Sequence, residues 1–112
     1  MSDCLFCKVV AGDIPANVIY EDDQCLAFED INPQAPTHAL VIPKLHLADQ
    51  REVGEGEKAL MGHLITVVNG VARDKGLTSF RTVINSGAEA GQTVFHLHLH
   101  LIGGRPMGWP PG

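Results

Sequence analysis

The sequence that decides the fold runs Phe95-His96-Leu97-His98-Leu99-His100-Leu101, in which apolar residues and histidines alternate. Successive side chains of a β-strand point to opposite faces of its sheet, so the alternation predicts a strand, with bounds at Thr93 and Ile102. We expect Phe95 and the leucines to face a hydrophobic core, and the histidines to face a cleft. The alternative is a half-buried strand whose polar face carries histidine without any function.

The periodicity of the flanking sequence predicts an α+β domain with an antiparallel sheet, one long helix and a short N-terminal helix. Apolar residues at Leu60, Leu64 and Val71 fall on one stripe of a helix over residues 55–75. The other expected elements are a short helix at 4–11, strands at 18–20, 25–28, 37–42 and 80–85, and an extended tail at 103–112. We expect a single domain over residues 1–112.

Composition and charge narrow the class of protein. The chain has 112 residues, of which 45% are hydrophobic, as in a globular domain. Its net charge of −5 argues against a nucleic-acid partner bound through a basic surface. No apolar run approaches the roughly 20 residues of a membrane span, and no apolar leader precedes Cys4, so we expect a cytoplasmic location and no membrane partner. Residues 76–112 contain two basic residues, Arg81 and Arg105, and one acidic residue, Glu89. This net positive charge favours an anionic small-molecule ligand in that part of the chain.

Spacing limits what the three histidines can do together. In a strand, the Cα atoms of His96 and His100 lie about 13 Å apart. A histidine Cα lies about 6–7 Å from a metal that it binds, so at most two of the three share one ion. Crowded imidazoles should titrate apart, leaving one neutral as a nucleophile and another holding a proton for a leaving group or an anionic oxygen. A histidine that attacks phosphorus forms a covalent intermediate.

The cysteines offer a metal site or a plain structural role. Three cysteines, Cys4, Cys7 and Cys25, cannot all pair, so a disulfide framework is not expected. Cys4 and Cys7 form a Cys-x-x-Cys pair that supplies two of the four ligands of a tetrahedral zinc. Two reduced cysteines packed in a short helix remain the alternative. A thioredoxin-like role is disfavoured because no β-α-β unit surrounds the pair.

Several segments of the sequence resemble a known protein family. Residues 91–102 are similar to the histidine-triad (HIT) motif, His-x-His-x-His followed by two apolar residues. Further similarity covers Ile14-Pro15-Ala16 and residues 27–38, 40–44 and 103–112. The ending Trp109-Pro110-Pro111-Gly112 favours the nucleotide-binding-protein (HINT) branch over the dinucleoside polyphosphate hydrolases of the fragile-histidine-triad branch.

The resemblance implies a homodimer with the HIT-like fold, its sheet extended across both chains. It also implies hydrolysis of adenosine or guanosine 5′-phosphoramidates, AMP–lysine among them, through a nucleotidyl-histidine. His98 is then the nucleophile, His100 a donor to the phosphate, and His38 a member of a proton relay with His96. Two alternatives stay open: a purine-nucleotide-binding or protein-interaction module with little catalysis, and a dinucleoside polyphosphate hydrolase.

The same resemblance assigns the nucleotide contacts. Asp30 accepts the ribose hydroxyls, although it could instead cap the turn at Asn32-Pro33. Donors to the phosphate are Asn85, the Thr93 hydroxyl and the Val94 N–H. The apolar base pocket is formed by Phe6, Phe28, Ile31 and Leu40, with Phe6 and Phe28 also expected in the core. Trp109 and the rest of the tail are expected near the partner subunit's active site.

The metal ligands implied by the resemblance are Cys4, Cys7, His46 and His96. Four protein ligands leave no open position, so the zinc is expected to be structural, and no organic cofactor is expected. His96 cannot both bind zinc and relay protons, and we favour zinc. His63, on the long helix, is expected at the surface rather than in a metal site.

Overall fold

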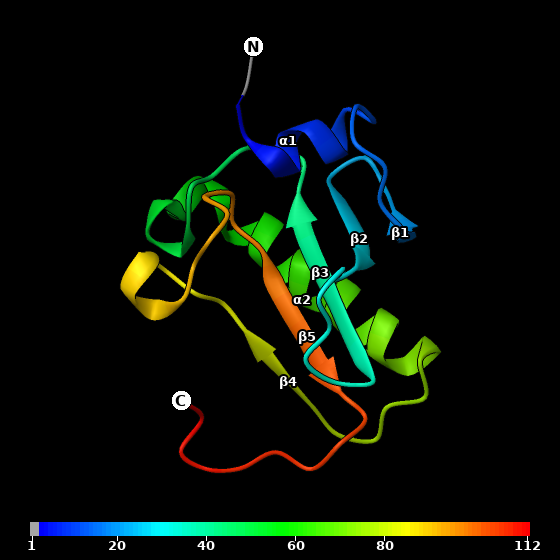
Figure 1. The fold of residues 1–112 in the computed structure, drawn as a ribbon. Helices are drawn as coiled ribbons and strands as arrows, with labels where there is room; N and C mark the ends of the chain where they lie inside the picture. Colours follow the sequence, from blue (N-terminus) through cyan, green and yellow to red (C-terminus); the bar gives the residue numbers. More distant parts are fainter. Residues whose placement is uncertain (1–2) are drawn as a thin grey trace.

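Five antiparallel strands in the order β1-β2-β3-β5-β4 form the sheet of the computed structural model, which describes residues 3–112 (Figure 1). The strands are β1 Val18–Glu21, β2 Cys25–Glu29, β3 Thr37–Pro43, β4 Phe80–Val83 and β5 Leu99–Gly103. Two helices, α1 Leu5–Val10 and α2 Lys58–Asp74, accompany three short 3₁₀ turns at Gln50–Glu52, Glu55–Glu57 and Ala88–Ala90. The predicted α+β class with an antiparallel sheet is confirmed.

Helix α2 covers one face of the sheet (Figure 1). Its apolar stripe is buried, with Leu64 fully enclosed, and packs into one cluster with Leu99 and Leu101 of β5. Burying one such leucine contributes about 1.5–3 kcal/mol, so the stripe fixes the helix on the sheet. The predicted long helix is confirmed from Lys58 onward, whereas its expected first turn is a separate 3₁₀ turn.

The opposite face of the sheet holds a second apolar cluster and the histidines. Phe6 of α1 packs edge-on against Phe28 of β2, with ring centres 5.5 Å apart. Leu26, Leu40 and Ile42 complete this cluster. Leu40 lies directly opposite His100 in the β3–β5 ladder, so both side chains point to this face. The two faces of the sheet therefore differ. The face beneath α2 forms a hydrophobic core, and the face beside α1 carries a polar site.

The strand predicted from Thr93 is shorter than expected, because β5 begins at Leu99. Before that point the chain leaves the ladder, and the Leu97 N–H donates to the carbonyl of Leu47. Leu97 is buried with the other leucines, but Phe95 is 49% exposed and does not share their face. The expected strand at 80–85 also ends earlier, at Val83.

The C-terminal tail leaves the sheet beyond β5 and projects past β4 (Figure 1). After Gly103 it contains no helix or strand, as the sequence predicted. Arg81 of β4 donates to the carbonyl of Gly108, and its guanidinium lies 5.8 Å from the ring centre of Trp109. The tail is thus tethered to the edge strand although Trp109 itself is 83% exposed.

No helix in the described part of the chain has the length and apolar character needed to cross a membrane.

A close contact between Asp22 and His63 anchors the β1–β2 turn to α2. Asp22 Oδ2 lies 2.6 Å from Nε2 of His63, and Asp22 Oδ1 accepts the backbone N–H groups of Gln24 and Cys25. Partial burial opposes ionisation of Asp22, but these hydrogen bonds and that from Tyr20 outweigh it and hold the pKa of this carboxyl well below its usual range. His63 is therefore partly exposed, as expected, but has a defined structural partner.

Replacing Asp22 by alanine should destabilise the fold, because the donors of the turn and His63 lose their common acceptor. We expect the free energy of unfolding to fall by about 1–3 kcal/mol at pH 7. The folded carboxyl has the lower pKa, so its contribution is complete above about pH 4 and disappears as the pH falls further. Urea unfolding at pH 7 measures the loss of unfolding free energy. The matched control is Asp23→Ala, which replaces the exposed neighbouring aspartate. Equal stability of the two variants would contradict the anchoring role.

Candidate active site and metal centre

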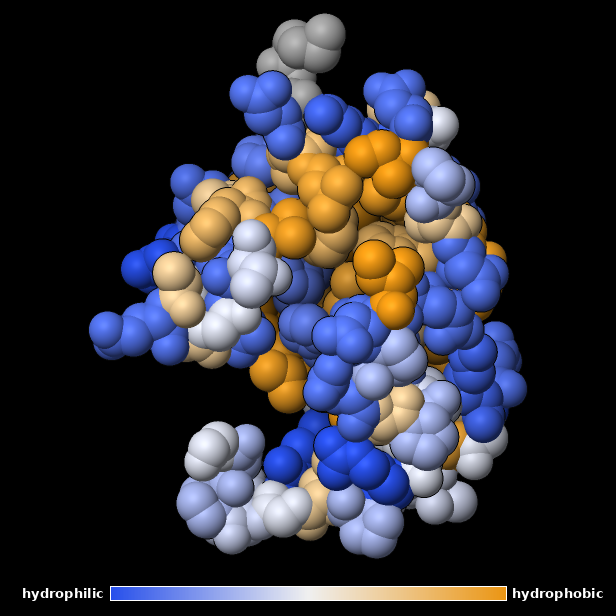
Figure 2. Space-filling view, viewed as in Figure 1, coloured by the Kyte–Doolittle hydropathy of each residue, from blue (hydrophilic) through white to orange (hydrophobic). Residues whose placement is uncertain are grey.

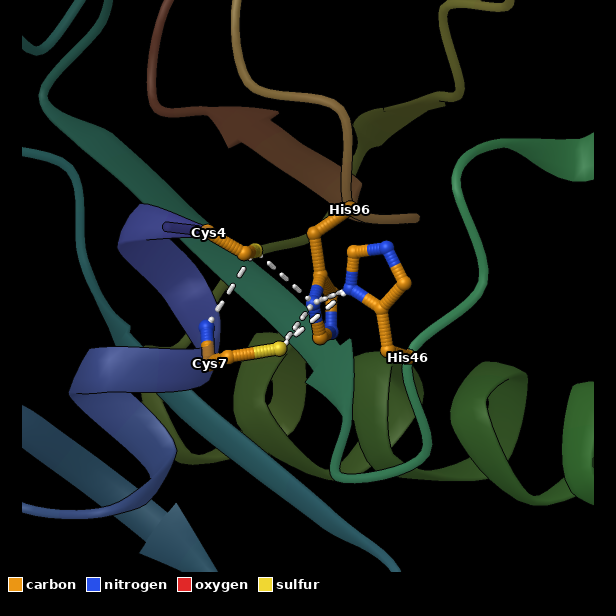
Figure 3. A group of neighbouring side chains, drawn as sticks. All are labelled: Cys4, Cys7, His46 and His96. Carbon is orange, nitrogen blue, oxygen red and sulfur yellow. Dashed lines mark hydrogen bonds between the residues drawn. The ribbon is translucent and has the colours of Figure 1, made fainter. Parts of the chain in front are cut away.

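Cys4, Cys7, His46 and His96 converge on one point at the N-terminal end of α1 (Figure 3). Cys4 is the N-cap residue of α1 and Cys7 lies in its first turn, so the helix turn itself brings the two sulfurs together. His46 comes from the segment after β3, and His96 from the irregular segment before β5. The sequence prediction of these four residues as one set agrees with their positions.

The donor atoms match the edges of a tetrahedral zinc site. The two Nδ1 atoms of His46 and His96 lie 3.1 Å apart, and sulfur–nitrogen distances are 3.3 to 3.5 Å. Zinc bond lengths of about 2.0 Å to nitrogen and 2.3 Å to sulfur give tetrahedral edges of about 3.3 Å and 3.6 Å. The Nε2 of His96 donates to the carbonyl of Pro43 at 2.8 Å, which leaves the Nδ1 lone pair for a metal. The residues present therefore fit zinc.

His98 is held with one nitrogen engaged and the other available. Its Nδ1 donates to the backbone carbonyl of His96 at 2.7 Å, so Nε2 retains its lone pair. The edge of its ring packs against Phe6, with ring centres 5.1 Å apart, and the side chain is buried. This arrangement fixes the tautomer of His98 and the direction of its Nε2 atom.

His38, His100 and Asp30 form a second polar group beside His98. The Nε2 of His38 lies 2.9 Å from Nδ1 of His100 and 3.3 Å from Oδ2 of Asp30. Asp30 Oδ1 accepts the N–H of Asn32, so the turn cap that the sequence left as an alternative is present beside the functional candidate. The pairing of β3 with β5 brings His38 against His100, and in the described residues no hydrogen bond joins His38 to His96.

Burial makes the three motif histidines hard to protonate. Desolvation is the main cause that lowers the pKa of His96 and of His98. The pKa of His100 falls to about 4 through burial and through the neighbouring His98 and His38. Burial therefore favours the neutral form of all three rings. Each neutral ring still offers one donor and one acceptor.

An apolar cavity of about 320 Å³ opens beside His98 and His100. Figure 2 shows hydrophobic surface gathered around α1 on this side of the molecule. Of the predicted contacts, the cavity is lined by Phe6, Phe28, Ile31, Leu40, Asp30, Thr93 and Val94. Its size is that of a small-ligand site, and its wall is apolar at one end and polar at the histidines.

Two predicted contacts lie outside this cavity. Asn85 follows β4, near Gly91, and does not line it. Trp109 stands on the exposed tail beside Arg81. Conversely, Leu5, Val9 and Ile14-Pro15-Ala16 line the cavity without having been assigned to it. The Ile14-Pro15-Ala16 stretch was part of the family resemblance, and this similarity was the sequence signal that could have assigned it to the cavity.

Comparison with known proteins identifies the family. The model of the HIT domain matches residues 11–107, and the chain belongs to the HIT family. A curated relative, an uncharacterized HIT-like protein of Synechocystis, is 55% identical over 98% of this chain and 97% of its own length. A 14 kDa zinc-binding protein of maize is 46% identical over 99% of this chain and 89% of its own length.

Solved structures agree in fold. A HIT family hydrolase from Legionella pneumophila superposes with a TM-score of 0.96 at 47% identity, covering 98% of this chain and all of the other. A zinc-bound histidine triad family protein from Mycobacterium smegmatis gives a TM-score of 0.79 at 39% identity, covering 92% of this chain and 76% of the other.

The low pKa of His100 predicts a pH-dependent loss of stability. An unfolded histidine titrates near 6.5, so between about pH 6.5 and 4 the unfolded chain binds the extra proton and the folded chain does not. Stability should fall as the pH is lowered through that window. NMR titration of the His100 imidazole, with unfolding measured at pH 7 and 5, checks this. The loss between pH 7 and 5 should be smaller in His100→Asn, and an unperturbed titration of His100 would contradict the burial argument.

Proposed function

We propose that this chain is a HINT-type hydrolase that cleaves the P–N bond of purine nucleoside 5′-phosphoramidates. The observation that carries the proposal is the position of His98, whose Nδ1 is engaged by a backbone carbonyl while its ring lines an apolar cavity. A neutral imidazole with a free Nε2 is a nucleophile suited to phosphorus. Relatives named HIT family hydrolases, from Legionella pneumophila and Clostridium thermocellum, support hydrolysis.

The charge of the cavity favours an amine as the leaving group. The lining includes Glu29 and Asp30 and no lysine or arginine. A dinucleoside polyphosphate would bring several negative charges past these carboxylates, whereas an amine brings none. This supports a phosphoramidate over the polyphosphate alternative.

In the first step, His98 Nε2 attacks the α-phosphorus and the P–N bond breaks. The bond electrons leave with the amine nitrogen, which takes up a proton from solvent, and the ring becomes a nucleotidyl-imidazolium. The His96 carbonyl, which already accepts Nδ1–H, stabilises this positive charge. His100 and the Thr93 hydroxyl donate to the phosphate oxygens, and Asp30 Oδ2 accepts a ribose hydroxyl.

In the second step, water attacks the same phosphorus and displaces His98. The P–O bond to water forms, the P–N bond to the ring breaks, and the proton consumed in the first step returns to solvent. Nucleoside monophosphate is released and His98 is neutral again. The burial that lowers the pKa of His98 favours this neutral, nucleophilic form.

His98→Ala should lower turnover of a fluorogenic adenosine phosphoramidate by several orders of magnitude, because it removes the attacking atom. Binding of AMP should change little, since the ribose and base contacts remain. Asp30→Ala should instead weaken binding with a smaller effect on turnover. Steady-state kinetics and calorimetric titration with AMP measure the two effects. Full activity in His98→Ala would reject the mechanism, and a wild-type chain that binds AMP without turnover would favour the binding-module alternative.

We further propose that Cys4, Cys7, His46 and His96 hold a structural zinc. The zinc-binding maize protein and the zinc-bound mycobacterial protein support this, together with the tetrahedral donor distances. Bound there, zinc would tie α1 to the segment before β5 and would supply no reactive position.

Protein prepared without chelator should contain about one zinc per chain by elemental analysis. Cys4→Ser with Cys7→Ser should lower the melting temperature strongly while retaining much of the turnover. The matched control is Cys25→Ser, which removes a thiol outside the cluster. Zinc-free protein of unchanged stability would reject the site, and lost turnover at unchanged stability would indicate a catalytic ion.

We also propose a two-fold dimer formed along β4. This strand is at the edge of the sheet, and Phe80 on it is exposed. Joining two β4 strands would extend the sheet and bring each Trp109 tail toward the other chain. Sedimentation at micromolar concentration should give the mass of two chains, and a monomer there would contradict the proposal.

A further inference from the structure

A chain of polar contacts runs from the C-terminal tail to the active site. Arg105, just beyond β5, donates through Nε to the carbonyl of Gln34 at 3.1 Å. The backbone N–H of the same Gln34 donates to Nδ1 of His38 at 3.0 Å. His38 Nε2 in turn lies 2.9 Å from Nδ1 of His100. Three successive hydrogen bonds therefore connect four residues, one each from the tail, the turn before β3, β3 and β5.

This chain fixes where the imidazole protons lie. A backbone N–H can only donate, so Nδ1 of His38 must accept and the proton of His38 must be on Nε2. That proton is donated to Nδ1 of His100, which places the proton of His100 on its own Nε2. His100 lines the cavity, so its remaining N–H is the donor available to a phosphate oxygen. With the opposite tautomer, His100 would present a lone pair to the phosphate and repel it.

The Gln34 peptide lies in an exposed turn, so it needs to be held in place. The turn follows Asp30, whose Oδ1 caps it at Asn32. On its other side the tail approaches closely, because a Cβ on Gly104 would lie 3.0 Å from Cβ of Pro36. Gly104 has a φ of +92°, a conformation that suits glycine and directs the following Arg105 back toward Gln34. Among the described residues 3–112, Arg105 is the only one whose side chain donates a hydrogen bond to the Gln34 carbonyl.

We propose that Arg105 is a positioning residue for the reaction: it holds the Gln34 peptide so that its N–H sets the tautomer of His38, and through His38 the tautomer of His100. The role rests on the proposed phosphoramidate hydrolysis, but the proton arrangement does not. Asp30 Oδ2, 3.3 Å from His38 Nε2, is the competing acceptor for the same proton. A loosened Gln34 would let the His38 ring turn toward it and release His100.

The test combines imidazole NMR with kinetics on the full chain. Protein labelled with ¹⁵N-histidine reports directly which ring nitrogen carries the proton, with His38→Asn used to assign the His38 signals. In the wild type, His38 Nδ1 should be unprotonated and Nε2 protonated. In Arg105→Ala, both signals should shift toward averaged positions. The kcat for a fluorogenic adenosine phosphoramidate should fall about two- to ten-fold with little change in KM, as for the loss of one hydrogen bond.

Two further variants separate positioning from a general effect on the fold. Arg105→Lys retains a donor and should recover part of both the NMR signature and kcat. Arg73→Ala removes an exposed arginine from α2, on the other side of the sheet, and should change neither. A wild-type His38 protonated on Nδ1 would overturn the proposal, as would an Arg105→Ala chain with unchanged ¹⁵N signals. If the wild type fails to hydrolyse the substrate while the signals respond to Arg105, the proposed function fails and the positioning stands.

Discussion

The hydrogen bond from His98 Nδ1 to the backbone carbonyl of His96 is the interaction on which the rest of the site depends. It selects one tautomer and leaves one nitrogen of His98 free at the cavity. The carbonyl is itself held by the surrounding structure, since His96 binds Pro43 through Nε2 and Leu97 binds Leu47 through its N–H. Cys4, Cys7 and His46 contact the side chain of the same His96. Three sets of contacts thus hold the irregular segment before β5. A strand held by its ladder hydrogen bonds would not need them.

The division of the sheet into two faces explains how a small domain combines stability with a polar site. The core beneath α2 buries leucines and valines and needs no functional side chain. The other face places histidines next to Phe6 and Phe28, where the apolar surroundings lower their pKa values. Because β3 and β5 are adjacent, His38 and His100 meet although 62 positions separate them.

The sequence was sufficient for the class of fold, the long helix and the four metal-ligand candidates. The alternating stretch at 95–101 predicted the correct burial of Leu97, Leu99 and Leu101, because their spacing survives even where the strand does not. It could not predict that the chain leaves the ladder before Leu99, since that depends on the distant carbonyl of Leu47. Nor could it reveal that the Gln34 backbone contacts His38, or that His63 contacts Asp22, because neither contact has a local pattern.

In the proposed mechanism, His98 becomes covalently bonded to the nucleotide. To detect this bond, wild-type protein is quenched with acid-free denaturant during turnover of adenosine phosphoramidate. The quenched protein is then analysed by peptide mass spectrometry. We expect an adduct of one adenosine monophosphate on His98, and no such adduct in the same digest of His98→Ala. An adduct on any other residue would contradict the covalent mechanism, as would turnover with no adduct in either the wild type or a slowed His100→Asn chain.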